Sequence, residues 1–111
     1  MNDEAQKHDD GKLPIHLIAP ELLVAVATIL DFGAKKYGPR NWEDGLKYSR
    51  VFSAIMRHMW SWWSGRNLDP ESKYSHLWHA ACGLMFLIAY EHRGMAGLDD
   101  RPQGNPIEMG K

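Results

Sequence analysis

Apolar side chains recur at helical spacing in the first half of the chain. In the first such stretch they follow a period of 3.6 residues, at Leu22, Leu23, Val26, Ile29 and Leu30. This stripe predicts a helix that begins at Pro20, a residue favoured in a first helical turn, and that ends at Gly38. After a loop rich in turn residues, a second helix is predicted from about Tyr48 to Ser64, where Gly65 closes it.

A third helix is predicted to start near Asp69. The order Asp69-Pro70-Glu71 supplies a capping residue, a proline and an acid, as is typical of a first turn. The helix runs to about Arg93, with a break allowed near Ser75. It is apolar nearly all round, at Leu77, Trp78, Ala81, Leu84, Met85, Leu87 and Ile88. Such a helix usually lies at the centre of a fold or in an interface, so we expect a homo-oligomer.

The pattern as a whole predicts an all-α fold, because neither alternating strands nor internal repeats stand out. We expect a small bundle of three main helices that oligomerisation completes. Residues 1–19 form an N-terminal extended segment, 20–93 the helical domain and 94–111 an irregular C-terminal tail. The tail is rich in glycine and is expected to pack on the body or on a neighbour.

Composition narrows the class of protein. Among 111 residues, 13 Lys and Arg nearly balance 14 Asp and Glu, and the net charge of −1 argues against coating a nucleic-acid polymer. No apolar run approaches the length of a membrane span, and the polar first ten residues do not resemble a signal peptide. A single cysteine, Cys82, excludes an intrachain disulfide. We therefore expect a cytoplasmic protein that engages neither membranes nor nucleic-acid polymers.

Tryptophan is enriched, with five in the chain. We expect four of them to build core and interface, at Trp60, Trp62, Trp63 and Trp78. Trp42 differs because it lies on a polar loop, where it and Tyr37 are candidates to stack on a nucleotide base.

Two histidines on the third predicted helix are the first candidates for chemistry. His76 and His79 are three residues apart and share a helix face with Ala80 and Gly83, whose small side chains leave space above the backbone. Histidines beside such a space suit a metal ion or a phosphate group. The alternative is a pair of core histidines at a tight helix crossing.

Basic residues are the candidates for binding an anion. Arg50 and Arg57 lie two turns apart on the second predicted helix, next to His58, and paired guanidinium groups grip phosphate oxygens well. The run from Phe32 to Trp42 adds Lys35, Lys36, Arg40 and Asn41. For each set, the alternative is a solvated charged surface or a lysine at a helix end.

Two acids, Asp69 and Glu71, precede His76 in the chain. They are candidate metal ligands together with the histidines, in a mixed set of carboxylates and imidazoles. Their alternative role is capping of the third helix.

Taken in order, several motifs resemble the phage-associated dATP/dGTP diphosphohydrolase, N-terminal domain, family. They are DGKLP at 10–14, LIAPE at 17–21, FGAKKYG at 32–38, NW at 41–42, Gly45, YSR at 48–50, RH at 57–58, WW at 62–63, DPES at 69–72 and SHLWHA at 75–80. The resemblance implies hydrolysis of a purine deoxynucleoside triphosphate to its monophosphate and pyrophosphate, with a divalent metal.

The chain is also loosely similar to MazG-like all-α pyrophosphohydrolases, which hold Mg²⁺ with Glu-x-x-Glu on one helix and Glu-x-x-Asp on a later one. Here His76 and His79 stand at the comparable place. Imidazole suits Zn²⁺ or Mn²⁺ better than Mg²⁺. Either the metal differs, or Glu21, Asp69 and Glu71 supply the acids, or the chain binds nucleotides without cutting them.

These observations predict a metal-dependent dNTP pyrophosphohydrolase whose nucleotide-binding domain is 20–93, acting in the infected host cell if a phage encodes it. The predicted catalytic residues are His58, His76, His79 and Glu71. A metal, Mg²⁺, Mn²⁺ or Zn²⁺, is assigned to His58, Asp69, Glu71, His76 and His79. The nucleotide is assigned to Lys12, Lys35, Lys36, Asn41, Trp42, Arg50 and Arg57.

Two alternative functions remain open at this stage. One is a non-catalytic nucleotide-binding protein, such as a phage sponge that sequesters a host defence signalling nucleotide. The other is a structural helical protein whose histidines belong to the core.

Overall fold

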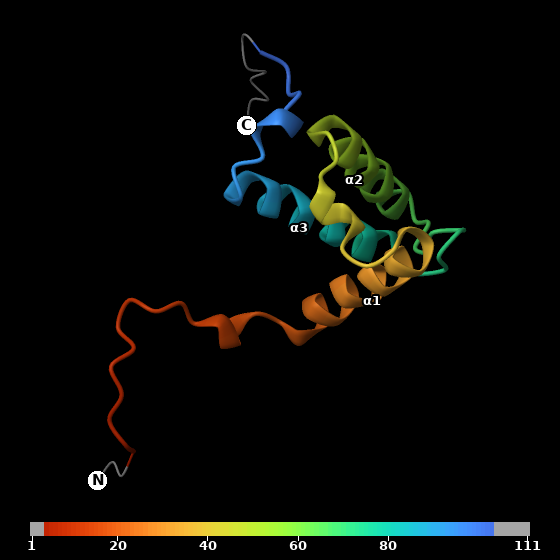
Figure 1. The fold of residues 1–111 in the computed structure, drawn as a ribbon. Helices are drawn as coiled ribbons and strands as arrows, with labels where there is room; N and C mark the ends of the chain where they lie inside the picture. Colours follow the sequence, from red (N-terminus) through yellow and green to blue (C-terminus); the bar gives the residue numbers. More distant parts are fainter. Residues whose placement is uncertain (1–3, 104–111) are drawn as a thin grey trace, which may run out of the picture.

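The computed structural model describes residues 4–103 and is built from three α-helices (Figure 1). They are α1 (Pro20–Tyr37), α2 (Tyr48–Trp63) and α3 (His76–His92). Three short 3-10 turns accompany them: η1 (Ile15–Leu17), η2 (Asn41–Asp44) and η3 (Ala96–Leu98). Residues 4–103 contain no strand beyond a single bridge between Leu68 and Ser75. The predicted all-α fold is confirmed.

The first two helices begin and end where local signals place them. Pro20 occupies the first turn of α1, and Gly38, with a φ of 93°, ends it in a conformation that glycine adopts without strain. The helix α2 begins at Tyr48 and ends at Trp63, one residue before the predicted Ser64.

The predicted start of the third helix near Asp69 is wrong, because α3 begins at His76. Ser75 caps the helix, and its Oγ accepts a hydrogen bond from the Leu77 backbone N–H at 3.1 Å. The preceding residues form a closed turn in which the Asp69 N–H donates to the Tyr74 carbonyl at 2.8 Å. The Tyr74 carbonyl accepts this bond, and the His76 N–H donates to the Asn67 carbonyl at 2.9 Å, so neither group follows the i to i+4 pattern of a helix continued from Asp69.

Helix α3 is the centre of the fold, because both α1 and α2 pack against it (Figure 1). Helix α2 crosses it closely at Gly83, where an added Cβ would lie 2.7 Å from Ile55 Cγ1. Val51 and Ile55 therefore fill the space above Ala80 and Gly83 that the sequence suggested for a ligand. At Ala80 and Gly83, α3 therefore forms a tight crossing with α2.

Two of the four tryptophans expected in the core and an interface lie on the surface. Trp60 and Trp63 are 68% and 73% exposed, so they do not belong to the core of this chain and stay candidates for an interface. Helix α3 also exposes apolar side chains, with Leu84 at 49% and Ile88 at 65%. Exposed apolar side chains of this kind are compatible with an interface, and the homo-oligomer stays a prediction.

The two ends of the described chain behave differently. The N-terminal segment runs away from the helices (Figure 1), and its Leu13 is 81% exposed. The beginning of the predicted tail instead returns to the body, where Met95 and Leu98 pack against the core. The rest of the tail, 104–111, lies outside the described residues. None of the helices in residues 4–103 is long and apolar enough to cross a membrane.

Candidate functional site

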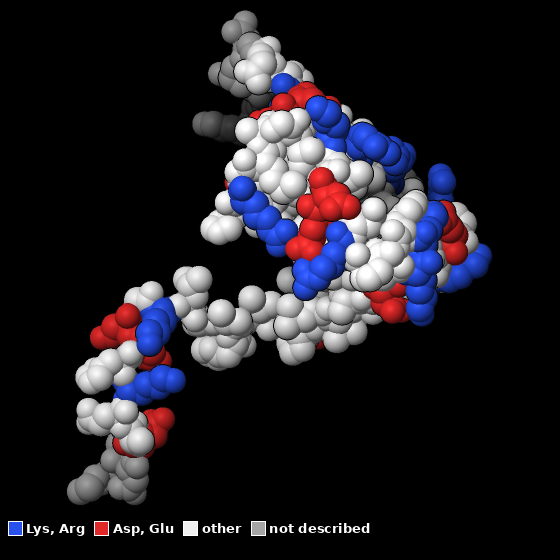
Figure 2. All heavy atoms as spheres, in the orientation of Figure 1, with Lys and Arg blue, Asp and Glu red and all other residues white. Residues whose placement is uncertain are grey.

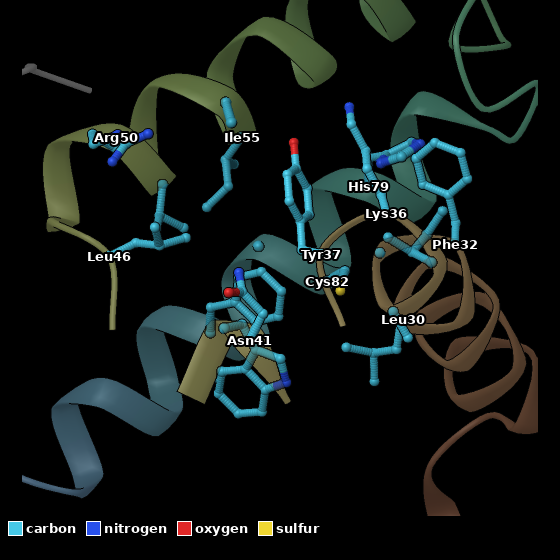
Figure 3. Close-up of a pocket in the computed structure, with 18 of the residues that line it drawn as sticks. Leu30, Phe32, Lys36, Tyr37, Asn41, Leu46, Arg50, Ile55, His79 and Cys82 are labelled. Carbon is cyan, nitrogen blue, oxygen red and sulfur yellow. The ribbon is translucent and has the colours of Figure 1, made fainter. Parts of the chain in front are cut away.

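A cavity of about 1380 Å³ opens among the helices and the η2 turn. Its walls come from the second half of α1, from η2 and from α2, and side chains of α3 also line it. Figure 3 shows Lys36, Asn41, Arg50 and His79 around this space, contributed by four different elements. The chain thus brings polar groups far apart in the sequence to one place.

Most of the predicted site residues line this cavity. They are Lys36, Asn41, Trp42, Arg50, Arg57, His58, Asp69, Glu71 and His79. His76 is buried, at 6% exposure, and reaches the site through its contact with His58. Lys35 does not line the cavity, and it forms an exposed ion pair with Asp31 at 3.0 Å. Lys12 lies in the segment before η1, also away from the cavity lining.

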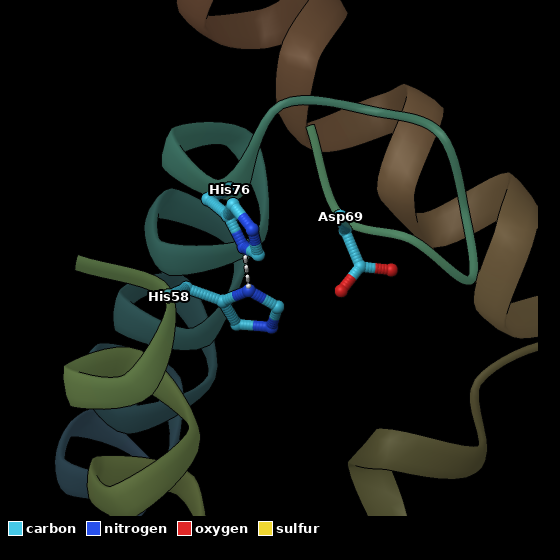
Figure 4. Close-up of side chains that lie close together, drawn as sticks. All are labelled: His58, Asp69 and His76. Atoms are coloured by element: carbon cyan, nitrogen blue, oxygen red, sulfur yellow. Dashed lines mark hydrogen bonds between the residues drawn. The ribbon is translucent and has the colours of Figure 1, made fainter. Parts of the chain in front are cut away.

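Three side chains form a compact cluster (Figure 4), and two of them, His58 and Asp69, line the cavity. His58 comes from α2, His76 from the first turn of α3 and Asp69 from the connection between them. The two Nδ1 atoms lie 2.8 Å apart, and one potential ligand atom from each of the three residues lies within 4.8 Å of the others. At 2.8 Å, one imidazole donates a proton and the other accepts it.

Asp69 is held in place by the turn that it begins. Its Oδ2 accepts hydrogen bonds from the backbone N–H of Ser72 at 2.8 Å and of Glu71 at 3.1 Å. Ser72 also joins His79 to this turn, since its Oγ lies 2.6 Å from His79 Nε2. Sequence reasoning gave Ser72 no role in the site. The spacing of Asp69 and Ser72, three residues apart around a proline, was the signal for such a turn.

The surroundings favour the neutral imidazole at His58 and His79 and the charged carboxylate at Asp69. Burial, followed by repulsion from His79, lowers the pKa of His58 to about 4. Burial also lowers the pKa of His79. Burial alone would raise the pKa of Asp69, but the Ser72 backbone N–H and neighbouring His79 outweigh it and lower that pKa. Neutral imidazole nitrogens beside a carboxylate are the state that binds a divalent metal.

The cations around the cavity fall into two groups. Lys36 forms an ion pair with Glu71, which links α1 to the connection before α3. Arg50 and Arg57 also line the cavity, and within residues 4–103 neither has a carboxylate partner. Their guanidinium groups are therefore available to an anion. Figure 2 shows Lys and Arg mixed with Asp and Glu over the same side of the molecule, not one continuous basic surface.

Trp42 lines the cavity but is also part of the packing. Its ring stacks on Phe86 at 4.9 Å between centroids, and its carbonyl accepts a hydrogen bond from the Tyr90 hydroxyl at 2.5 Å. The Arg93 guanidinium lies 5.2 Å from the Trp42 ring centroid. Tyr37, which is 63% exposed and lines the same cavity, keeps more of its ring surface accessible.

The fold and the site define a small all-α protein in which an imidazole–carboxylate cluster and two arginines with no carboxylate partner among residues 4–103 lie at one cavity. The family model described as dATP/dGTP diphosphohydrolase, N-terminal, matches residues 2–101, and the chain belongs to this family. A protein of Salmonella phage PMBT28 named dATP/dGTP diphosphohydrolase is 42% identical over 82 residues. The match covers 74% of this chain but 28% of that relative. No solved structure matches.

Proposed function

We propose that this chain binds purine deoxynucleoside triphosphates and hydrolyses them to the monophosphate and pyrophosphate. The observation that carries the proposal is the cavity that His58, Asp69, Arg50 and Arg57 line together, with His76 in contact with His58. Family membership and the printed name of the phage relative support the class of substrate.

The cations suit the phosphate chain of such a substrate. Arg50 and Arg57 lie on α2 and have no internal carboxylate to neutralise them within the described part of the chain. Two guanidinium groups offer paired N–H donors to phosphate oxygens and offset the negative charge that builds up as the leaving pyrophosphate departs. Lys36 adds a third positive charge once Glu71 releases it.

The cluster suits a divalent cation close to those phosphates. His58 is neutral at pH 7 and Asp69 is charged, which is the donor chemistry that a mixed nitrogen and oxygen site needs. Such an ion, when bound, polarises a phosphate and lowers the pKa of a bound water. In the hydrolysis, water adds to the α-phosphorus, and the bond from that phosphorus to the bridging oxygen of pyrophosphate breaks.

This chain matches only part of the length of the phage relative. The matched segment spans 28% of the phage relative, so the complete reaction is a proposal for this chain and needs a direct measurement. The base preference is equally a proposal. The exposed ring of Tyr37 and the packed ring of Trp42 are the candidates to contact the base.

The test is release of pyrophosphate from each of the four dNTPs, with Mg²⁺, Mn²⁺ or Zn²⁺ and with EDTA. We expect turnover of dATP and dGTP in the presence of a divalent metal and none in EDTA. An absence of turnover with every nucleotide and metal would remove the enzymatic proposal. If a nucleotide still raises the melting temperature in EDTA and is recovered intact, the chain is a nucleotide-binding protein instead.

A further inference from the structure

We infer that His58, Asp69 and His76 form a three-ligand site for one transition-metal ion of the Zn²⁺ type, and that His79 stands outside its coordination sphere. The inference deepens the proposed function, because it names the metal class and its ligands. Metal binding can nevertheless be measured without any nucleotide, so the two proposals can fail separately.

The imidazoles of His58 and His76 face each other. The rings of His58 and His76 are tilted by 45°, with centroids 5.1 Å apart, and their Nδ1 atoms approach to 2.8 Å. Both nitrogens therefore direct their lone pair or proton into one shared space (Figure 4). A tetrahedral ion about 2.0–2.1 Å from each nitrogen separates the two by roughly 3.3 Å. Replacing the shared proton by an ion thus needs only a small outward movement of one ring.

The third ligand is the carboxylate of Asp69. Asp69 comes from a different segment, and one of its carboxylate oxygens lies within 4.8 Å of a ring nitrogen of each histidine (Figure 4). Both backbone hydrogen bonds that fix it end on Oδ2, and in the described part of the chain Oδ1 accepts none. The carboxylate is held in place by its turn before any metal arrives, which reduces the entropy lost on binding.

The orientation and contacts of His79 place it outside the set of metal ligands. Its ring lies nearly parallel to that of His58, at 9° and with centroids 4.5 Å apart. The lone pairs of an imidazole lie in the plane of the ring, so an ion in the plane of His58 lies out of the plane of His79. In addition, His79 Nε2 is 2.6 Å from Ser72 Oγ, and the Ser72 backbone N–H supports Asp69. His79 is thus a positioning residue for the carboxylate.

The types of ligand indicate which metal the site binds. Mg²⁺ prefers oxygen ligands, whereas two imidazoles and one carboxylate suit Zn²⁺ and its first-row neighbours. Three protein ligands leave a position open, as in catalytic rather than structural zinc sites. His58 and Asp69 line the cavity and His76 is buried behind them, so the open position faces the cavity.

Equilibrium dialysis of the purified chain against Zn²⁺ tests the site, with Mg²⁺ as the comparison and no nucleotide present. We expect one Zn²⁺ per chain, bound more tightly than Mg²⁺. His58→Gln and Asp69→Asn should each weaken Zn²⁺ binding by more than about 100-fold, the upper end for losing an outer-shell partner. His79→Gln should change it by about tenfold or less, and His92→Gln, at an exposed histidine of α3, should leave it unchanged.

His76→Gln removes a buried side chain, so circular dichroism must first show that this variant folds. If it does not, His58→Gln and Asp69→Asn carry the test, because both residues line the cavity. The site is overturned if the wild-type chain binds no Zn²⁺, if Mg²⁺ binds more tightly, or if His79→Gln alone abolishes binding. Stoichiometric Zn²⁺ with no hydrolysis of any dNTP retains the site and removes the proposed reaction.

Discussion

Cys82 is a nucleophilic residue that the fold makes inert. The side chain is 2% exposed, and burial raises the pKa of its thiol from 9.0 to about 11. The thiolate is the reactive form of cysteine, and its fraction at a given pH falls as the pKa rises. At pH 8 the folded chain therefore holds about 100-fold less thiolate than a thiol of ordinary pKa.

This burial gives a prediction for labelling with iodoacetamide at pH 8. Cys82 in the folded chain should react at least about 100-fold more slowly than in the same chain unfolded in urea, because both access and thiolate fraction are reduced. The label is counted by mass spectrometry over time. Similar rates in the two states would show that α3 is accessible at Cys82 and contradict the packing.

Ser75 controls where α3 begins, which is a second effect at the level of one side chain. Its Oγ accepts the hydrogen bond from the Leu77 N–H, so Ser75→Ala should lower the free energy of unfolding by about 1 kcal/mol. Ser53→Ala, at an exposed position inside α2, is the matched control and should change it by less than about 0.5 kcal/mol. Urea titration measures both. Equal losses would argue against the cap.

At the level of elements, the crossing of α2 over α3 depends on Gly83. Because a Cβ there would lie 2.7 Å from Ile55 Cγ1, Gly83→Ala should destabilise the chain by about 1–3 kcal/mol as α2 is forced outward. Gly33 in α1 is the control, since nothing lies within 4 Å of its added Cβ. Gly33→Ala should be neutral or stabilising by up to about 1 kcal/mol. Thermal unfolding measures the stability of both variants. Equal changes in Gly83→Ala and Gly33→Ala would contradict the close crossing at Gly83.

Elements with strong local signals could be predicted from the sequence, and elements with competing signals could not. Pro20 and Gly38 mark the ends of α1 through their own backbone preferences. Asp69 carries an equally clear local signal for a helix start, but the hydrogen bond from the His76 N–H to the Asn67 carbonyl closes a turn instead. That bond joins residues nine positions apart, so the periodicity of apolar residues in the sequence does not predict it.

The candidate site was predictable in composition but not in arrangement. Helical spacing places His76 and His79 on one face, and both contact His58, but in different ways: His76 hydrogen-bonds to His58, whereas His79 stacks on it and bonds to Ser72. Which histidine hydrogen-bonds to His58 depends on the register of the α2 crossing, which the packing at Gly83 fixes. A single helix cannot reveal this register.

At the level of the whole molecule, the large apolar surface is the feature that one chain leaves unexplained. Phe52, Met56, Trp60 and Trp63 lie three or four residues apart on α2, and each is exposed by 47% or more. This spacing makes a continuous apolar stripe on one side of the helix. Stripes of this kind usually mark an interface.

We therefore predict a homo-oligomer that Trp60→Glu disrupts. A charge in the middle of a buried apolar stripe is costly, so the variant should elute at a smaller mass than the wild-type chain in light-scattering chromatography. Asn67→Glu, at an exposed residue beyond the end of α2, introduces the same charge outside the stripe and should keep the wild-type mass. A monomeric wild-type chain at high concentration would falsify this prediction.

The ion pair between Lys36 and Glu71 has a consequence for the kind of ligand that the cavity accepts. Glu71 acts as an internal counter-ion, and an incoming anion gains Lys36 only by displacing it. A singly charged ligand exchanges one ion pair for another and gains little, whereas a polyphosphate engages Arg50 and Arg57 as well. At the proposed nucleotide site, Glu71 would therefore favour a ligand with several negative charges, such as a nucleoside triphosphate, over a singly charged anion.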